Sequence, residues 1–371
     1  MNAIGILTMH RVINHGSFLQ AYALKRIIEN NVAQSECHFI DIPISSNNIF
    51  DWFSKNNLNR IKLILHRMLR HTAFCLDVYA LWQLEELRSI YIKQLAEKLN
   101  VTNERNYKTK YDSVIIGSDE VFNVTQDSPW GSTMLLFGQG INSSNIISYA
   151  GSFGDTTLES ISNSGLEISI RNGFGNFRAL SVRDQNSYSI VRELTGINPY
   201  IHRDPVLVYD FTYEIEKSNL NGRYILVYQY PNRISEKSFI KGIKRIAKKR
   251  NLKIISTYGY CDWADSNVVL QSFELLRYFR DSAFVITDTF HGCVLSIKYN
   301  KQFFVFCRDS NKNKVSDLLL SYGLENQIVN DDSIFDRINS EIDWSTINSK
   351  VIDERKRATE YLVSSLTFDR K

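Results

Sequence analysis

Residues 283–292 read AFVITDTFHG, a short apolar run that passes directly into polar residues. Such a run, rich in valine, isoleucine and phenylalanine and bounded by turn residues, is typical of a buried strand. Helical periodicity follows at Val294–Asn300. The stretch therefore predicts a strand at Ala283–Thr287, a polar turn that contains His291, and then a helix.

The same order of strand, turn and helix recurs along the chain. We predict further strands at Ile4–Met9, His38–Ile42, Ser113–Gly117, Ile146–Ala150, Leu180–Arg183, Tyr224–Tyr228, Lys253–Thr257 and Phe303–Phe306. Further helices are predicted at Ser17–Asn30, about Leu58–Leu99, Ser235–Arg250, Ser272–Asp281, Val315–Tyr322 and Thr346–Leu366. Strands that alternate with helices indicate parallel sheets covered by helices, so the predicted fold class is α/β.

A domain boundary is predicted at about residues 196–205, where two of the five prolines and a glycine fall. The chain has 371 residues, which is enough for two domains of ordinary size. We expect an N-terminal α/β domain at residues 1–200 and a C-terminal α/β domain at residues 201–371, whose last helix could pack back on the first domain. Two Rossmann-like halves with a cleft between them would bind a ligand at the carboxyl ends of their strands.

Composition and charge exclude several classes of protein. The formal net charge is only +4, from 44 basic and 40 acidic residues, which is far from the charge of a dedicated nucleic-acid-binding protein. The five cysteines form no CxxC pair and the histidines show no metal-ligand spacing, so we expect no metal site. The sequence has neither a signal-peptide pattern nor a membrane-spanning apolar run, and we expect a cytoplasmic protein.

Three more polar turns follow predicted strands, and each allows two interpretations. Asn14, Gly16 and Ser17 lead into a helix whose first N–H groups favour an anion, or Ser17 is simply a helix cap. Asp119 and Asn123 could hold sugar hydroxyls, or Asp119 could cap a short helix.

The third turn contains Ser152, within the sequence SYAGSFG at residues 148–154. Its small residues permit a ligand to approach the backbone closely. An ordinary turn explains the same residues, so Ser152 is a candidate binding residue on position alone.

Four cationic residues are candidates for binding an anionic group. Arg183 ends a predicted strand, and its guanidinium could bind a carboxylate or phosphate or could form a salt bridge with a neighbouring aspartate. Arg308, Lys312 and Lys314 lie in a polar loop after the strand Phe303–Phe306. They could clamp a small anion, and a solvated loop explains them equally well.

His291 is the candidate for proton transfer, because histidine is the side chain that titrates near neutral pH. The alternative is a structural histidine whose hydrogen bonds are satisfied. The basic residues of 241–250 are most simply the exposed face of an amphipathic helix. Residues 60–70 mix bulky apolar and basic side chains, so they could rest on an anionic membrane surface, or they could form a helix packed on the core.

Several of these segments together resemble one family. They are GILT at 5–8, NHGSFLQAYAL at 14–24, GSDEVFN at 117–123, SYAGSFG at 148–154, SVRD at 181–184, DPVL at 204–207 and FHG at 290–292. Their order and spacing over about residues 4–323 are similar to those of the polysaccharide pyruvyl transferase family. The resemblance implies two domains of the glycosyltransferase-B type. It also implies transfer of a pyruvyl group from phosphoenolpyruvate to two hydroxyls of one sugar, as a cyclic ketal on a bacterial surface or capsular polysaccharide.

Carried onto this chain, the resemblance makes His291 the catalytic general acid and Arg183 a contact to the donor. The sequence departs from the family at Thr289, where many members have an arginine that holds phosphoenolpyruvate. Thr289 is retained as a candidate substrate contact, and a cation in the loop 308–314 could supply the missing charge. Glu120 and Phe122 stand where related members usually have glutamine and tryptophan, so acceptor contacts on the N-terminal domain could differ.

The resemblance implies no metal or organic cofactor, with phosphoenolpyruvate as the donor substrate. The acceptor would be a saccharide, lipid-linked or free, and a lipid-linked one would suit peripheral contact with the inner membrane. No nucleic-acid partner is expected. One alternative is a glycosyltransferase that uses a nucleotide-sugar donor on the same scaffold. Another is a non-catalytic carbohydrate-binding or assembly module, which the departures at Thr289 and Glu120 make conceivable.

Overall fold

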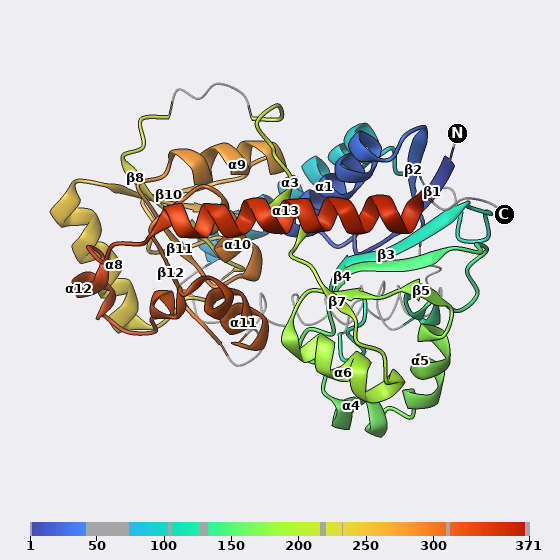
Figure 1. The fold of residues 1–371 in the computed structure, drawn as a ribbon. Coiled ribbons are helices and arrows are strands. Elements are labelled where there is room, and N and C mark those ends of the chain that lie inside the picture. The colour runs from blue at the N-terminus through green and yellow to red at the C-terminus, as the bar shows by residue number, and fades with distance from the viewer. Residues whose placement is uncertain are drawn as a thin grey trace.

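The structure is a computed structural model that describes residues 2–41, 74–102, 106–126, 133–215, 220–231, 233–308 and 312–367, without the side chains of 74–81 and 335–336. Two parallel sheets, each covered by helices, lie side by side (Figure 1). The α/β fold class predicted from the alternation of strands and helices is confirmed. The basic stretch 60–70, with its proposed membrane contact, lies outside the described residues.

The first sheet is built by the N-terminal part of the chain. Its strand order is β2-β1-β3-β4-β6-β7, with β5 paired to β4, and the described pairs are parallel. The strands are β1 (Asn2–Leu7), β2 (Ser35–Phe39), β3 (Ser113–Asp119), β4 (Ile146–Gly151), β5 (Phe177–Ala179), β6 (Ser181–Val182) and β7 (Tyr200–Ile201). The helices are α1 (His15–Asn31), α3 (Phe74–Leu99), η1 (Met134–Phe137), α4 (Leu158–Asn163), α5 (Glu167–Phe174), α6 (Gln185–Thr195) and α7 (Pro205–Val208).

The second sheet has the order β10-β9-β8-β11-β12 and is also parallel. Its strands are β8 (Tyr224–Tyr228), β9 (Lys253–Thr257), β10 (Ser266–Val268), β11 (Phe284–Thr287) and β12 (Phe303–Val305). The helices are α8 (Lys237–Arg250), α9 (Ser272–Asp281), α10 (Phe290–Lys298), α11 (Lys312–Tyr322), η3 (Glu325–Gln327), α12 (Ile334–Arg337) and α13 (Trp344–Leu366). β8 and β11 are buried along their whole length, because helices cover both faces of the sheet.

Two helix starts differ from the predictions, and both carry candidate residues. α1 begins at His15, and the side chain of Asn14 caps it by accepting from the Gly16 N–H, so Ser17 is not the cap. α10 begins at Phe290 and not at Val294, because the Thr289 side chain caps it. His291 therefore lies in the first turn of α10 and not in a turn before it.

The last helix, α13, runs across both sheets (Figure 1). The Tyr361 hydroxyl donates to the Ser148 carbonyl in β4 at 2.8 Å. One cluster of buried apolar side chains includes Ile6 of β1, Leu226 of β8 and Leu362 of α13. The two sheets thus share one core, which holds them in place on either side of the space between them. The predicted domain boundary at residue 200 stays a prediction. Of the helices that the structure describes, none is both long and apolar enough to cross a membrane.

Candidate functional site

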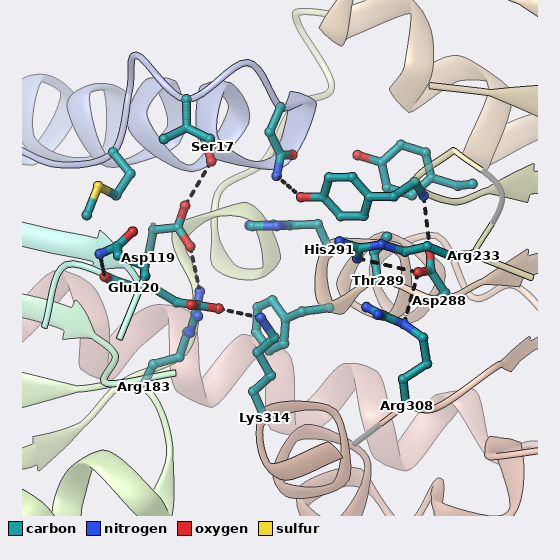
Figure 2. A pocket seen from close by; sticks show the side chains of 17 residues that line it. Ser17, Asp119, Glu120, Arg183, Arg233, Asp288, Thr289, His291, Arg308 and Lys314 are labelled. Atoms are coloured by element: carbon teal, nitrogen blue, oxygen red, sulfur yellow. Dashed lines mark hydrogen bonds and ion pairs between the residues drawn. The ribbon is translucent and has the colours of Figure 1, made fainter. Parts of the chain in front are cut away.

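A pocket of about 270 Å³ opens where the loops of the two sheets face each other (Figure 2). Its walls come from segments that follow β1, β3 and β6 in the first sheet and β8, β11 and β12 in the second. The lining residues are Met9, Val12, Asn14, Ser17, Asp119, Glu120, Gln126, Arg183, Tyr228, Tyr230, Arg233, Asp288, Thr289, Phe290, His291, Arg308 and Lys314. A ligand site at the carboxyl ends of parallel strands is the arrangement expected of an α/β fold.

The loop between β1 and α1 reaches both sides of the pocket. The Asn14 amide donates to the Tyr230 hydroxyl of the second half at 2.7 Å, and the Ser17 hydroxyl donates to Asp119 Oδ2 at 2.9 Å. Gly16 packs so closely against the His291 ring that a Cβ placed on Gly16 would lie only 2.1 Å from His291 Nδ1. Any side chain at residue 16 would therefore displace the imidazole.

An ion pair between Glu120 and Lys314 joins the two halves across the pocket (Figure 2). Burial alone would raise the pKa of Glu120, but the charge and hydrogen bond of Lys314 lower it to about 2. Glu120 is therefore ionised at neutral pH, and its charge is matched by the opposite half of the molecule.

Arg183 is buried at the base of the pocket, with 3% of its surface exposed. Its Nη1 donates to Asp204 Oδ2 at 2.9 Å and lies 3.7 Å from Asp119 Oδ1, and its guanidinium stacks 4.2 Å above the Phe290 ring. Burial opposes the charged form, but Asp204 and Asp119 raise the pKa of Arg183 above its ordinary value. Of the two interpretations of this arginine, the salt bridge is present, and the side chain also lines the pocket.

His291 enters the pocket from the first turn of α10. The Thr289 hydroxyl accepts from the Gly292 N–H at 2.9 Å, which fixes this turn. His291 Nε2 lies 3.6 Å from Asp204 Oδ2, and the residue is 7% exposed. Nε2 is buried and forms no hydrogen bond, so the carboxylate lies beside it without binding it, and the ring lines the cavity.

Two arginines surround a buried carboxylate on the second half of the pocket. Arg233 Nη1 and Arg308 Nε lie 3.6 Å and 3.5 Å from Asp288 Oδ2. Burial raises the pKa of Asp288, and the two guanidinium groups offset this only in part. Burial and the charge of Arg233 lower the pKa of Arg308. Two cations beside one carboxylate leave this edge positive, which suits an anionic ligand.

Four of the predicted binding residues are not part of the pocket lining: Gly16, which packs against the His291 ring, and Asn123, Ser152 and Lys312. Asn123 donates its amide to Glu120 Oε2 at 2.8 Å and accepts from neighbouring backbone and hydroxyl groups, so it organises the loop behind the pocket. The buried Ser152 hydroxyl donates to Asp184. Lys312 is exposed at the start of α11, two residues before Lys314, so the two side chains point in nearly opposite directions around the helix. Short polar side chains next to buried strands here form hydrogen bonds within the loops and do not face the pocket.

Several lining residues were missed by the sequence reasoning. Tyr230 and Arg233 follow β8, and Asp288 follows β11, so the rule that polar residues gather after buried strands would have found all three. Gln126 lies far from the end of β3 and carries no such signal. Within the described residues, no group of histidine, cysteine, aspartate and glutamate side chains could hold a metal ion.

Comparison with known proteins supports both the fold and the family. A UDP-N-acetylglucosamine 2-epimerase structure covers 100% of this chain and 97% of its own, with a TM-score of 0.54 at 10% identity. The same enzyme from Neisseria meningitidis, bound to UDP-GlcNAc, covers 99% of both chains, with a TM-score of 0.50 at 9% identity. These structures share the fold alone, and the predicted glycosyltransferase-B-like architecture is confirmed.

Sequence comparison is more specific than structure at such low identity. No curated protein matches the sequence. The family model described as polysaccharide pyruvyl transferase matches residues 14–310, which include the residues that line the pocket except Met9, Val12 and Lys314. The chain belongs to the polysaccharide pyruvyl transferase family.

Proposed function

We propose that the protein transfers a pyruvyl group from phosphoenolpyruvate to two hydroxyls of one sugar, as a cyclic ketal, in bacterial surface or capsular polysaccharide synthesis. The observation that carries this proposal is one pocket that combines His291 with the cations Arg183, Arg233, Arg308 and Lys314. Phosphoenolpyruvate has a phosphate and a carboxylate, so its binding requires several positive groups.

The donor is best matched by the second half of the pocket. Arg233 and Arg308 offer two guanidinium groups beside Asp288, and such groups bind phosphate or carboxylate with paired hydrogen bonds. The N-terminus of α10, which carries Thr289 and His291, adds a favourable dipole for an anion. In this proposal Arg233 and Arg308 together supply the charge that an arginine at position 289 provides in many family members.

The acceptor sugar is best matched by the first half. Asn14, Asp119, Glu120 and Gln126 provide hydrogen-bonding groups along one wall, and the Tyr230 hydroxyl meets this wall from the second half through Asn14. Both free and lipid-linked saccharides are candidate acceptors. The donor is a cytoplasmic metabolite, which supports action in the cytoplasm, at the membrane face if the acceptor is lipid-linked.

The proposed reaction is acid–base chemistry and needs no metal or organic cofactor. His291 donates a proton to the methylene carbon of phosphoenolpyruvate, so a C–H bond forms and C2 becomes electrophilic. One sugar hydroxyl adds to C2 and returns its proton to His291. The C2–O bond to phosphate then breaks, and the second hydroxyl closes the ketal while its proton leaves with inorganic phosphate. Holding both hydroxyls beside one carbon supplies much of the rate by proximity.

The test is an assay of the purified protein with phosphoenolpyruvate and a panel of free and lipid-linked saccharides. Release of inorganic phosphate, together with a product heavier by one pyruvyl group in mass spectrometry, is the expected result. Tight binding of a UDP- or GDP-sugar without any binding of phosphoenolpyruvate would instead support the nucleotide-sugar glycosyltransferase. Binding of saccharide with no turnover of either donor would support the non-catalytic module.

A further inference from the structure

Asp204 lies behind the pocket, between two residues that line it. Its Oδ2 accepts from Arg183 Nη1 at 2.9 Å and lies 3.6 Å from His291 Nε2, while its Oδ1 accepts from the Val206 N–H at 2.9 Å. The residue is 2% exposed and is not part of the pocket lining. Asp204 therefore cannot touch a substrate, and any effect that it has on the reaction must pass through its neighbours.

The Asp204 carboxylate is ionised in this setting. Burial would raise its pKa, but His291, Arg183 and the Val206 N–H lower it below the ordinary value. The titratable groups that face it are Arg183 after β6, His291 on α10 and Tyr149 of β4. A buried negative charge at this point favours the tautomer of His291 in which the nitrogen that faces Asp204 carries the hydrogen.

The two ring nitrogens of His291 have different surroundings. Nε2 is buried without a hydrogen bond and faces Asp204 Oδ2 at 3.6 Å, and Gly16 packs over the ring face on the Nδ1 side. A carboxylate beside one nitrogen of an imidazole favours the tautomer that carries the hydrogen on that nitrogen, and the other nitrogen then exchanges protons with a ligand. The exchanging nitrogen here is then Nδ1.

We propose that Asp204 is the positioning residue of this site: it holds His291 through Nε2–H and leaves Nδ1 to deliver the proton to phosphoenolpyruvate. This inference rests on the proposed function. In the protonation step the Nδ1–H bond breaks and a C–H bond forms on the methylene carbon. The imidazolium becomes a neutral ring that keeps its Nε2 hydrogen, and Asp204 stays ionised throughout. Because the same carboxylate oxygen also binds Arg183, Asp204 ties the proton donor to the guanidinium at the base of the pocket.

The variant Asp204→Asn keeps the volume of the side chain and removes its charge. We expect kcat to fall by on the order of 10²- to 10⁴-fold, as when a general acid is disabled, and the KM for phosphoenolpyruvate to change much less than kcat, because Arg183 keeps Asp119 beside it. A kcat that stays unchanged would overturn the proposal.

The chain offers a matched control. Asp41 bonds Arg11 and lies 3.5 Å from His10 Nε2, which is the same trio of residue types outside the pocket lining. Asp41→Asn should lower the melting temperature without changing kcat. If both variants changed activity in proportion to their loss of stability, the role of Asp204 would be structural only.

A measurement on the unmutated protein covers the case in which Asp204→Asn does not fold. In ¹⁵N-histidine-labelled protein at high pH, the His291 signal, assigned by its loss in His291→Gln, should show the Nε2–H tautomer. An Nδ1–H tautomer would overturn the assignment of the nitrogens. This readout needs no substrate, so it stands even if no saccharide is turned over. If the wild type turned over phosphoenolpyruvate but showed the Nδ1–H tautomer, this inference would be wrong and the proposed function would still stand.

Discussion

His291 and His202 are both more than nine-tenths buried, yet their surroundings differ in kind. His202 hydrogen-bonds the Ser181 hydroxyl at 2.8 Å and stacks on Tyr149, and burial lowers its pKa to about 4. His291 lines the pocket and faces a carboxylate. Replacing His291 by glutamine should reduce kcat for phosphate release by on the order of 10²- to 10⁴-fold, because the proton donor is lost. The melting temperature should change little.

His202→Gln is the control for that experiment. It disturbs a packed and hydrogen-bonded ring, so it should lower the melting temperature while the kcat of the folded fraction stays near that of the wild type. A His291→Gln enzyme with near-normal phosphate release would mean that another group donates the proton.

Arg233 is the cation that sequence reasoning missed, and it provides a test of the donor site. It lies 3.6 Å from Asp288 and packs 4.0 Å over the Tyr230 ring. Hydrogen bonds to charged groups contribute about 1.5–3 kcal/mol, so Arg233→Ala should raise the KM for phosphoenolpyruvate by roughly 10- to 100-fold. Steady-state kinetics with the acceptor at saturation measure this effect. Arg250→Ala, on the exposed face of α8, should leave the KM unchanged. If Arg233→Ala also left the KM for phosphoenolpyruvate unchanged, Arg233 would not be part of the donor site.

At the scale of elements, the first turn of α10 depends on one hydroxyl. Thr289 caps the helix through Gly292, and His291 lies inside the capped turn. Thr289→Ala should cost about 1 kcal/mol of unfolding free energy and should also lower kcat, because the turn that aims the imidazole loosens. Thr289→Ser keeps the oxygen and should restore both quantities. Urea unfolding and phosphate release measure them, and a serine variant that behaved like alanine would show that the cap does not position His291.

Elements with a continuous apolar signal were predictable from the sequence. The predicted bounds Tyr224–Tyr228, Lys253–Thr257 and Ser272–Asp281 are those of β8, β9 and α9. Some short elements were not predicted, among them β7 and β10, which have too few residues to show a period. The helix predicted from Val294 begins at Phe290, and a glycine fits in its first turn because a Cβ on Gly292 would lie 2.0 Å from Thr287 Oγ1.

The site was predictable to the extent that strand ends fix positions. Asn14, Asp119, Arg183 and His291 all follow strands, and all line the pocket. The direction of a side chain within a loop was beyond the sequence, since it depends on hydrogen bonds that the loop forms only after folding. Asn123, for example, hydrogen-bonds Glu120 and Thr125 within its own loop and does not line the pocket.

At the scale of the whole molecule, the pocket exists because two separate sheets meet. α13 and the shared buried apolar cluster hold the two sheets together, and Glu120 and Lys314 connect them within the pocket. A ligand that enters must fit between walls already joined by this ion pair. The ion pair should therefore contribute to the stability of the contact between the two halves. It also sets part of the charge of the pocket walls that an acceptor or donor binds against.

Glu120→Gln tests the contribution to stability through its dependence on pH. The pKa of Glu120 is lowered from 4.5 to about 2 in the folded protein, so its contribution to stability is fully present above about pH 4.5 and is lost as the pH falls toward 2. The variant should be less stable than the wild type at pH 7, by on the order of 1 kcal/mol for a partly exposed pair. The difference between their urea midpoints should then narrow between pH 4.5 and the lowest pH at which both still fold. Glu167→Gln, which breaks an exposed pair with Arg171 within α5, should show little difference at any pH. A constant gap between Glu120→Gln and the wild type across this range would mean that the charge of Glu120 does not join the two halves.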